Sequence, residues 1–359
     1  MYGDVNKDKM ITLDGSLYEG GGQIIRNGLS LSVVLGTPVR IINIRANRPK
    51  PGLMPQHLTS LNLLSEMTNA VVQGSYIADT ETAGSISLML QLIIPPLIYN
   101  DDTTTSETTV IDLRGGTNVK FSPQIETLQM GLLPLLNNLL TDGRLKYKID
   151  FKARGCYPKG GGRIIFSMEK LPVETYPTKP IVLTNPGKIT SAHVSAWSCG
   201  KGPIASVNNA VDYVVRELSA FGCVPTMFIT DKPSSLHPYC SGIGIVAASH
   251  TDTGCILTSD HIIERNDKFE AIAEHMATEM SNLNKCVDSH IQDQLILFMA
   301  LSEGVSSIKC SYPLTNHTLS AMYVVNQFYP DYNFRQVVNE QDQSCILSYR
   351  GIGWTPTSI

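Results

Sequence analysis

The sequence lacks any long uninterrupted hydrophobic run. Its longest apolar stretch, from Leu88 to Tyr99, contains a glutamine and two prolines and is too short to cross a bilayer. The first ten residues, MYGDVNKDKM, contain no apolar signal core. This pattern predicts that the chain does not cross a membrane and is not secreted, so we expect an intracellular protein.

Closely spaced cysteines are also missing. The eight cysteines are scattered along the chain and none forms a C-x-x-C pair. This spacing argues against a zinc site and fits a reducing compartment. The sequence therefore predicts no thiol or metal chemistry at the cysteines, which are at positions 156, 199, 223, 240, 255, 286, 310 and 345.

Two familiar nucleotide motifs and an excess of positive charge are absent as well. There is no G-x-x-x-x-G-K-[ST] and no G-x-G-x-x-G, which disfavours the common ATP-binding and dinucleotide-binding folds. The formal net charge is −4, which excludes nucleic-acid binding by bulk electrostatics alone. A polynucleotide partner would have to be met by a local basic patch.

What is present is the composition of a globular protein, with 359 residues, 42% of them hydrophobic and 17% charged. YEGGGQIIR at 18–26 is echoed by YPKGGGRII at 157–165, which indicates repeated α/β units. The sequence pattern changes between 183 and 281, where the segment has helix and strand patterns of its own. We expect an inserted α/β domain at 183–281 and a main domain made of 1–182 plus 282–359.

One basic patch is visible in NIRANRPKPGLMPQHL, residues 43–58, between a β-like stretch and a helix that begins with proline. Arg45, Arg48 and Lys50 occur there within six positions. They could be a solvated loop. Alternatively, arginines held by prolines and a glycine lose less freedom on binding, which suits bidentate capture of phosphate oxygens.

The triple glycine in EGGGQIIR has two interpretations. Glycines serve turns with positive φ and close backbone packing. Bare backbone N–H groups at a helix N-terminus also form an anion site. In that case Glu19 is available to a metal, and Gln23 and Arg26 are available to phosphate, within two helical turns.

His317 stands in PLTNHTLSAMYVV, where polar residues give way to an apolar, helix-spaced stretch. A histidine at such a place commonly caps a turn or pairs with a backbone carbonyl. A catalytic role is the alternative. Neutral imidazole is abundant at pH 7, and a helix N-terminus disfavours the imidazolium form, so we expect His317 to be neutral.

Several motifs occur together and in a fixed order, and through them the whole chain resembles the RNA 3′-terminal phosphate cyclases. They are DGSLYEGGGQIIR, IRANRPKPGLMPQHL, TAGSISLMLQ, GGTN with SPQIE, RGCYPKGGG, DQLILFMAL and LTNHT. The resemblance implies an α/β (α+β) fold of repeated βαβ-type units, similar to carboxyvinyl transferases such as EPSP synthase, with a smaller inserted α/β domain. It also implies ATP-dependent conversion of an RNA 3′-phosphate into a 2′,3′-cyclic phosphodiester, a ligase-type reaction.

The resemblance further implies roles for individual residues. His317 would attack the α-phosphorus of ATP and become a covalent adenylate. Magnesium or manganese would neutralise the ATP phosphates, with Glu19 near the metal and triphosphate. The adenine and ribose pocket would comprise Gln91, Pro123, His290, Asp293 and Gln294. The RNA 3′-phosphate would be held by Gln23, Arg26, Arg45, Arg48, Gln56 and His57.

The sequence departs from the family pattern at two places. Position 290 is histidine where tyrosine is usual, so stacking or hydrogen bonding there is altered. The chain is also shorter between VVQGSYIADT and ETAGS, which usually enclose a strand-forming stretch. Either the first repeat lacks a strand pair or a mobile segment is absent from the numbered chain.

Two rivals remain. A ribosome-biogenesis branch of the same family acts in pre-rRNA processing without adenylation and shares the character of the C-terminal GIGWTPTS, but it lacks the EGGGQ motif and the histidine. A carboxyvinyl transferase is suggested only by fold analogy. Because this chain has Glu19, the arginines and His317, we favour the cyclase, with RNA as its partner and, in a eukaryote, the nucleus as its location.

Overall fold

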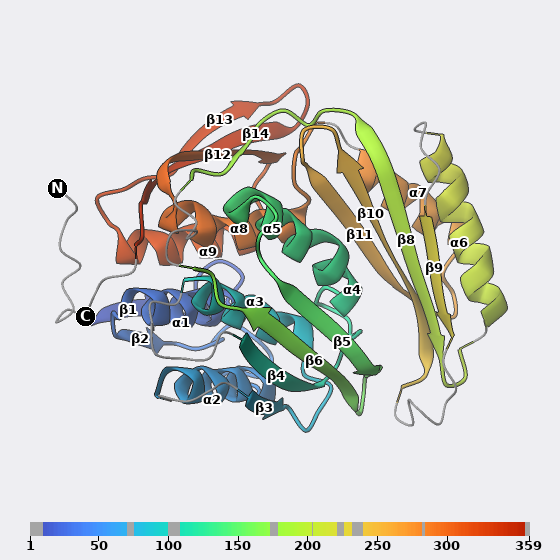
Figure 1. Ribbon diagram of the computed structural model, residues 1–359, viewed down its shortest axis with the longest axis horizontal. Coiled ribbons are helices and arrows are strands. Elements are labelled where there is room, and N and C mark those ends of the chain that lie inside the picture. Colours follow the sequence, from blue (N-terminus) through green and yellow to red (C-terminus); the bar gives the residue numbers. More distant parts are fainter. Residues whose placement is uncertain are drawn as a thin grey trace.

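The chain folds into three related α/β units and one further sheet with its own helices (Figure 1). None of the helices in the described part of the chain is long and apolar enough to cross a membrane. The computed structural model describes residues 10–69, 75–99, 108–172, 179–202, 204–220, 226–231, 240–281 and 284–355.

The first unit is a β-α-β segment followed by a second helix. Its two strands pair in parallel, with Ile11 opposite Val39. Both helices were predicted from the sequence, one after the triple glycine and one starting at Pro55, and both are confirmed. The elements are β1 (Ile11–Asp14), α1 (Gln23–Leu35), β2 (Val39–Ile42) and α2 (Pro55–Asn69).

The second unit has a complete four-stranded sheet in the order β3-β4-β6-β5. Strands β3 and β4 are parallel, and the hairpin β5–β6 adds to β4 in the antiparallel sense. Its elements are β3 (Ser75–Asp79), α3 (Ile86–Ile98), β4 (Thr108–Gly115), α4 (Ile125–Thr127), the π-helical turn η1 (Leu128–Leu132), α5 (Leu133–Thr141), β5 (Tyr147–Ala153) and β6 (Gly162–Glu169).

The third unit repeats this plan in the order β7-β12-β14-β13. Again two parallel strands are followed by an antiparallel hairpin, so the predicted α+β class and its repeated units are confirmed. The elements are β7 (Val182–Leu183), α8 (Ser289–Leu301), β12 (Glu303–Ser311), α9 (Asn316–Phe328), β13 (Arg335–Asn339) and β14 (Ser344–Ile352).

The first unit has fewer strands than the other two. In units two and three a hairpin pairs with the second parallel strand, whereas in the described residues of unit one the sheet consists of β1 and β2 alone. Only residues 70–74 separate the end of α2 from the start of β3. Both alternatives predict this arrangement, because a segment absent from the numbered chain would leave the same two-stranded sheet, so the choice between them stays a prediction.

A further four-stranded sheet, ordered β11-β10-β8-β9, is inserted in the sequence within unit three, between β7 and α8. One face packs on α6 and α7, which enclose a separate hydrophobic cluster, and the other faces α4 and η1 (Figure 1). The expected boundary at 183 falls inside β7, and the division into domains remains a prediction. The elements are β8 (Ile189–Cys199), α6 (Ile204–Ser219), β9 (Thr226–Asp231), β10 (Gly242–Thr251), β11 (Ile256–Ile263) and α7 (Phe269–Ser281).

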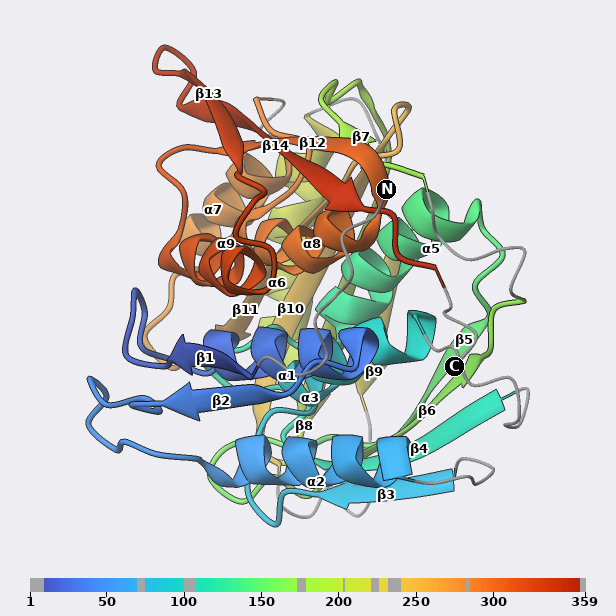
Figure 2. The ribbon, with the colours of Figure 1, turned by 90° about the vertical axis from the view of Figure 1, so that its left-hand side faces the viewer.

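Helices of all three units pack together in the middle of the molecule. Helix α1 contacts α3 and α9, and α8 contacts α3 and α9, so the units share one continuous hydrophobic core (Figures 1 and 2). Helix α3 is mostly apolar and is buried along nearly its whole length, as expected for a helix inside a core. This packing brings the N-terminal ends of α1 and α9 close together.

Candidate functional site

The site begins at the N-terminus of α1. Gly22 is the N-cap, no side chain caps the helix, and the first turn carries no acidic residue. In the described part of the chain, no capping side chain therefore accepts a hydrogen bond from the first backbone N–H groups of the helix. Such an end attracts an anion, since the helix dipole adds partial positive charge there.

Two of the three glycines leave room for charged side chains. A Cβ on Gly21 would collide with the carboxylate of Glu19. A Cβ on Gly22 would lie 2.6 Å from Nε2 of His57 and 2.8 Å from Nη1 of Arg26. The glycines at this position are therefore needed for close approach of functional groups to the helix end, as well as for the turn.

Glu19 joins two of the other predicted residues. Its Oε1 accepts a hydrogen bond from the guanidinium of Arg48, and its Oε2 lies 2.9 Å from Nδ1 of His317. The second contact is an ion pair by distance, but Oε2 has no hydrogen bond of good geometry in the described part of the chain. The carboxylate thus lies between a guanidinium and an imidazole.

These contacts shift the pKa values of Glu19 and His317 in opposite directions. Burial alone would raise the pKa of Glu19, but the contact with His317 and the charge of Arg48 outweigh it, and the pKa is lowered. The contact with Glu19 raises the pKa of His317 in spite of its partial burial. The start of α9 was expected to disfavour the imidazolium form, whereas the adjacent carboxylate stabilises it and moves the pKa of His317 upward.

Several buried hydrogen-bond donors around the first turn of α1 have no partner in the described part of the chain. They are Nε2 of Gln23, Nε of Arg26, Nδ2 of Asn27 and Nε of Arg48. Buried polar groups are nearly always hydrogen-bonded, so a cluster of unsatisfied donors indicates a place for an acceptor-rich ligand. A phosphate, with several oxygens, matches such a set.

His57 adds a neutral donor to this cluster. Burial, reinforced by the charges of Arg26 and Arg45, lowers the pKa of His57 to about 4. Its Nδ1 accepts a hydrogen bond from the backbone N–H of Met54 at 3.1 Å, so the proton of the neutral ring is on Nε2. Of all the neighbouring atoms, that nitrogen lies nearest to a Cβ built on Gly22, so it is close to the start of α1.

Gln56 and Arg45 border the same region. Gln56 Oε1 accepts a hydrogen bond from the backbone N–H of Ser85, which ties α2 to the start of α3. A small pocket is lined by Arg26, Gln56 and His57 together with apolar residues of α1 and α3. Arg45 donates to the carbonyl of Gly52 within its own loop and does not contact Glu19 directly.

The residues expected to form the nucleotide pocket lie on α3, before α4 and on α8. Gln91 is buried, and its Oε1 has no hydrogen-bond partner in the described ranges. The carbonyl of Pro123 accepts a hydrogen bond from Ser87 of α3, which fixes the segment before α4. His290, Asp293 and Gln294 belong to the first turns of α8, and Gln294 donates to Asp293 at 2.7 Å.

Asp293 connects the two parts of the site. It is buried, and burial raises the pKa of its carboxyl although the charges of His317, His290 and Arg26 oppose this. These interactions place Asp293 within electrostatic range of residues from α1 and α9. The structure thus brings Asp293, from the expected nucleotide pocket, close to Arg26 and His317.

Sequence reasoning missed three supporting residues. Asn27 is one of the unsatisfied donors, and its only signal is a polar residue on the buried side of α1. Gln292 donates to Thr318 at 2.8 Å and so locks α8 to the first turn of α9. Asp260 of β11 is partly buried near His290, and burial raises its pKa. The last two contacts join segments that are well separated in the sequence and leave no local pattern.

Glu19 is the residue expected to hold a metal. Within the described residues, the group of three side chains close enough to bind a metal consists of cysteines and does not include Glu19. Magnesium commonly uses one or two carboxylates and takes its other ligands from phosphates and water. A single carboxylate beside a cluster of phosphate-binding donors is compatible with that type of coordination.

The comparisons with known proteins identify the family of the chain. The family profile described as RNA 3′-terminal phosphate cyclase matches residues 17–332. An RNA 3′-terminal phosphate cyclase of Drosophila melanogaster is 31% identical over 97% of this chain and 98% of its own length. The proteins of the same name from Staphylothermus marinus and Thermococcus gammatolerans are 32% and 34% identical, over 97% and 89% of this chain and 100% and 92% of their own lengths. The chain belongs to the RNA 3′-terminal phosphate cyclase family.

Proposed function

We propose that this protein is a catalytically active RNA 3′-terminal phosphate cyclase. It converts an RNA 3′-phosphate to a 2′,3′-cyclic phosphodiester with ATP, through a covalent adenylate on His317 and an RNA(3′)pp(5′)A intermediate. The observation that carries the proposal is the contact between His317 and Glu19 beside the unsatisfied donors of α1. That arrangement combines a nucleophile with a place for phosphate groups.

The chemistry requires an activation step. A terminal phosphate monoester has no good leaving group, so a neighbouring 2′-hydroxyl cannot displace anything from it. Attack of His317 on the α-phosphorus of ATP releases pyrophosphate and forms a phosphoramidate. An oxygen of the RNA 3′-phosphate then takes the AMP, and the 2′-hydroxyl finally closes the ring with AMP as leaving group.

Glu19 supports the first step through its contact with Nδ1 of His317. With Nδ1 facing the carboxylate, Nε2 is the ring nitrogen that attacks phosphorus. The imidazole gains positive charge as the N–P bond forms, and the carboxylate stabilises that charge. The same interaction raises the pKa of His317, so the nucleophilic form is the deprotonated fraction.

The nucleotide is bound between α3, the segment at Pro123 and α8. Gln91 brings an unsatisfied buried acceptor to this pocket, and Asp293 with Gln294 supplies further polar groups. His290 replaces the usual tyrosine, and it keeps a flat ring for contact with the base. Selectivity for ATP among nucleotides is set by these groups.

The RNA phosphate is held by donors of α1, the loop after β2 and the start of α2. Arg26, Arg45 and Arg48 provide the positive charge, and Gln23, Gln56 and the neutral His57 add directed hydrogen bonds. Magnesium or manganese at Glu19 supplies neutralisation of the triphosphate. A nuclear location in a eukaryotic cell is a separate part of the proposal, which imaging of the tagged protein tests.

The test of the overall reaction uses an oligoribonucleotide with a 3′-phosphate, ATP and a divalent cation. The expected product resists phosphatase and gives a mixture of 2′- and 3′-phosphates after mild acid. His317→Ala should abolish it, whereas His275→Ala, which changes an exposed histidine of α7, should retain it. An unchanged RNA end with the unsubstituted protein would favour the non-catalytic RNA-processing factor.

A further inference from the structure

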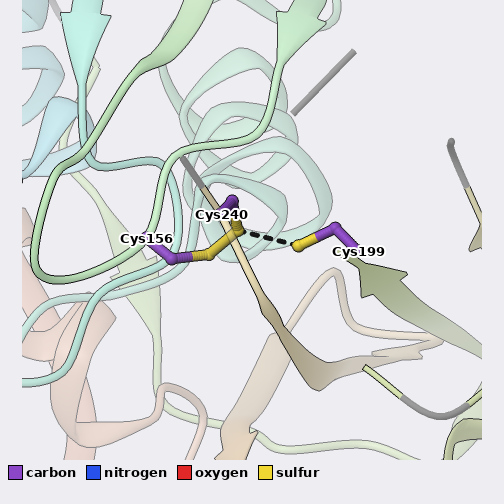
Figure 3. Close-up of side chains that lie close together, drawn as sticks. All are labelled: Cys156, Cys199 and Cys240. Atoms are coloured by element: carbon purple, nitrogen blue, oxygen red, sulfur yellow. Dashed lines mark hydrogen bonds between the residues drawn. A yellow bond between two sulfur atoms is a disulfide. The ribbon is translucent and has the colours of Figure 1, made fainter. Parts of the chain in front are cut away.

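Three cysteines that are far apart in the sequence meet where the sheet β11-β10-β8-β9 contacts the second unit (Figure 3). Cys156 lies in the loop between β5 and β6, Cys199 ends β8, and Cys240 stands just before β10. All three are buried, and their sulfurs lie within 4.8 Å of one another. The expectation of no thiol chemistry is wrong for these residues, because the fold assembles them.

The three sulfurs are arranged around Cys240. Cys156 and Cys240 form a disulfide. Sγ of Cys199, which is not part of a disulfide, lies 2.8 Å from Sγ of Cys240. Figure 3 shows the Cys240 sulfur between the other two, and a thiolate at such a position can attack the disulfide.

We propose that this cluster is a site of intramolecular thiol–disulfide exchange, in which Cys240 alternates between Cys156 and Cys199 as its partner. The Cys199 thiolate attacks Sγ of Cys240, and a Cys199–Cys240 bond forms as the Cys156–Cys240 bond breaks. The electron pair of the broken bond stays on the Cys156 sulfur, which takes up the proton that Cys199 has lost. The number of electrons is unchanged, so the step needs no external oxidant.

The two disulfides connect different parts of the molecule. The Cys156–Cys240 bond joins the β5–β6 loop to the inserted sheet. A Cys199–Cys240 bond would instead join two neighbouring antiparallel strands of that sheet, since Cys199 is opposite Gly242 in the β8–β10 pair. Exchange therefore attaches the loop to the sheet or releases it.

The attached loop packs against a segment that borders the candidate site. Gly160 in this loop is so close to the backbone of Thr82 that a Cβ would collide with it. Three residues further along, the backbone N–H of Ser85 donates to Gln56. Release of the loop thus removes a constraint on the segment from Thr82 to Ser85, whatever reaction the neighbouring site performs.

A metal ion is the other chemistry that three cysteines could support. Structural zinc sites are almost always four-coordinate. Within the described residues the group contains three cysteines and no fourth cysteine, histidine or carboxylate. Two of the three sulfurs are already bonded to each other, which removes them as thiolate ligands. The geometry therefore favours exchange over metal binding.

The test maps the disulfides of the unsubstituted protein, purified without reductant, alkylated at low pH and digested for mass spectrometry. Both the Cys156–Cys240 and the Cys199–Cys240 peptides are expected, with Cys199 and Cys156 respectively alkylated. The bonds close loops with sequence separations of 84 and 41, so the two forms should also separate in non-reducing electrophoresis. A single pairing that persists after prolonged incubation at alkaline pH would overturn the proposal.

Single cysteine substitutions test the exchange for each of the two disulfides. Cys199→Ser should leave only the first disulfide and Cys156→Ser only the second, whereas Cys310→Ser, at a buried cysteine outside the cluster, should keep both forms. Failure of Cys156→Ser to form the Cys199–Cys240 bond would contradict exchange. Three reduced thiols with one equivalent of zinc in the purified protein would also contradict it and indicate a metal site.

Discussion

Nδ1 of His317 lies 2.9 Å from Oε2 of Glu19, and the same carboxylate pairs with Arg48 through its other oxygen. The two members of this contact come from the first and the third unit, and it forms because α1 packs against α9. It fixes the orientation of the imidazole and couples its charge to a residue at the phosphate-binding end of α1.

The contact predicts a shift in pH dependence. Glu19 raises the pKa of His317, so the fraction of deprotonated nucleophile, and with it the rate of self-adenylation, should increase with pH up to that raised pKa. Glu19→Gln removes the carboxylate charge. Asp293, which raises the pKa of His317, and Arg26, which lowers it, remain. The midpoint of the rate profile should move to lower pH, measured by single-turnover adenylation.

The control for this experiment is Glu274→Gln, an exposed glutamate on α7. Its profile should coincide with that of the unsubstituted protein. A midpoint for Glu19→Gln that stays in place, or moves to higher pH, would show that the carboxylate does not control the proton on His317.

We predict that Arg45 binds the RNA phosphate and is not needed for the reaction with ATP. Its guanidinium donates to Gly52 and does not pair with Glu19. Arg45→Ala should therefore keep self-adenylation near normal and slow AMP transfer to RNA. Loss of a charged hydrogen bond costs about 2 to 4 kcal/mol, a rate effect of roughly 30- to 1000-fold.

Lys50→Ala is the matched control, since Lys50 is an exposed cation of the same loop. It should affect neither step strongly. Equal slowing of adenylation and transfer by Arg45→Ala, in rapid-quench measurements of each step, would refute the division between nucleotide and RNA residues.

Gly22→Ala tests the close approach of side chains to α1. The backbone at Gly22 has φ −80°, which alanine also adopts, so the cost is steric. The added Cβ displaces His57 and Arg26, and such displacement should slow transfer by about 10²-fold. Gly242→Ala, where the Cβ meets only ordinary contacts, is the control, and thermal unfolding shows whether either variant is merely unstable.

The proposed order of steps predicts how modified RNA ends behave. AMP transfer needs only the 3′-phosphate, whereas ring closure needs the 2′-hydroxyl. An RNA with a 2′-O-methyl 3′-phosphate end should accept AMP and then stall as RNA(3′)pp(5′)A, seen on a gel as a product one nucleotide longer. A 3′-hydroxyl end should not react, and its consumption of ATP would contradict the scheme.

Local patterns were sufficient to predict much of the fold. Helix α2 begins at Pro55 as expected, and the polar-to-apolar change at His317 marks the start of α9, which Thr315 caps. These features depend on residues within a few positions of each other. The ordered motifs then identified the residues that the structure brings together around α1 and α8.

Contacts between distant segments could not be predicted in this way. The pairing of His317 with Glu19, the lock between Gln292 and Thr318, and the meeting of the cysteines all arise from packing of distant segments. The raised pKa of His317 has the same origin. Its local position favours the neutral ring, and a carboxylate from another unit acts in the opposite direction.

Self-adenylation tests the central claim most directly. After incubation with α-labelled ATP and magnesium, the protein should carry a covalent label that is acid-labile and alkali-stable, as a phosphoramidate is, and peptide mapping should place it on His317. His317→Ala should carry no label, and His275→Ala should be labelled normally. An unlabelled wild-type protein, or a label that persists in His317→Ala, would contradict the account.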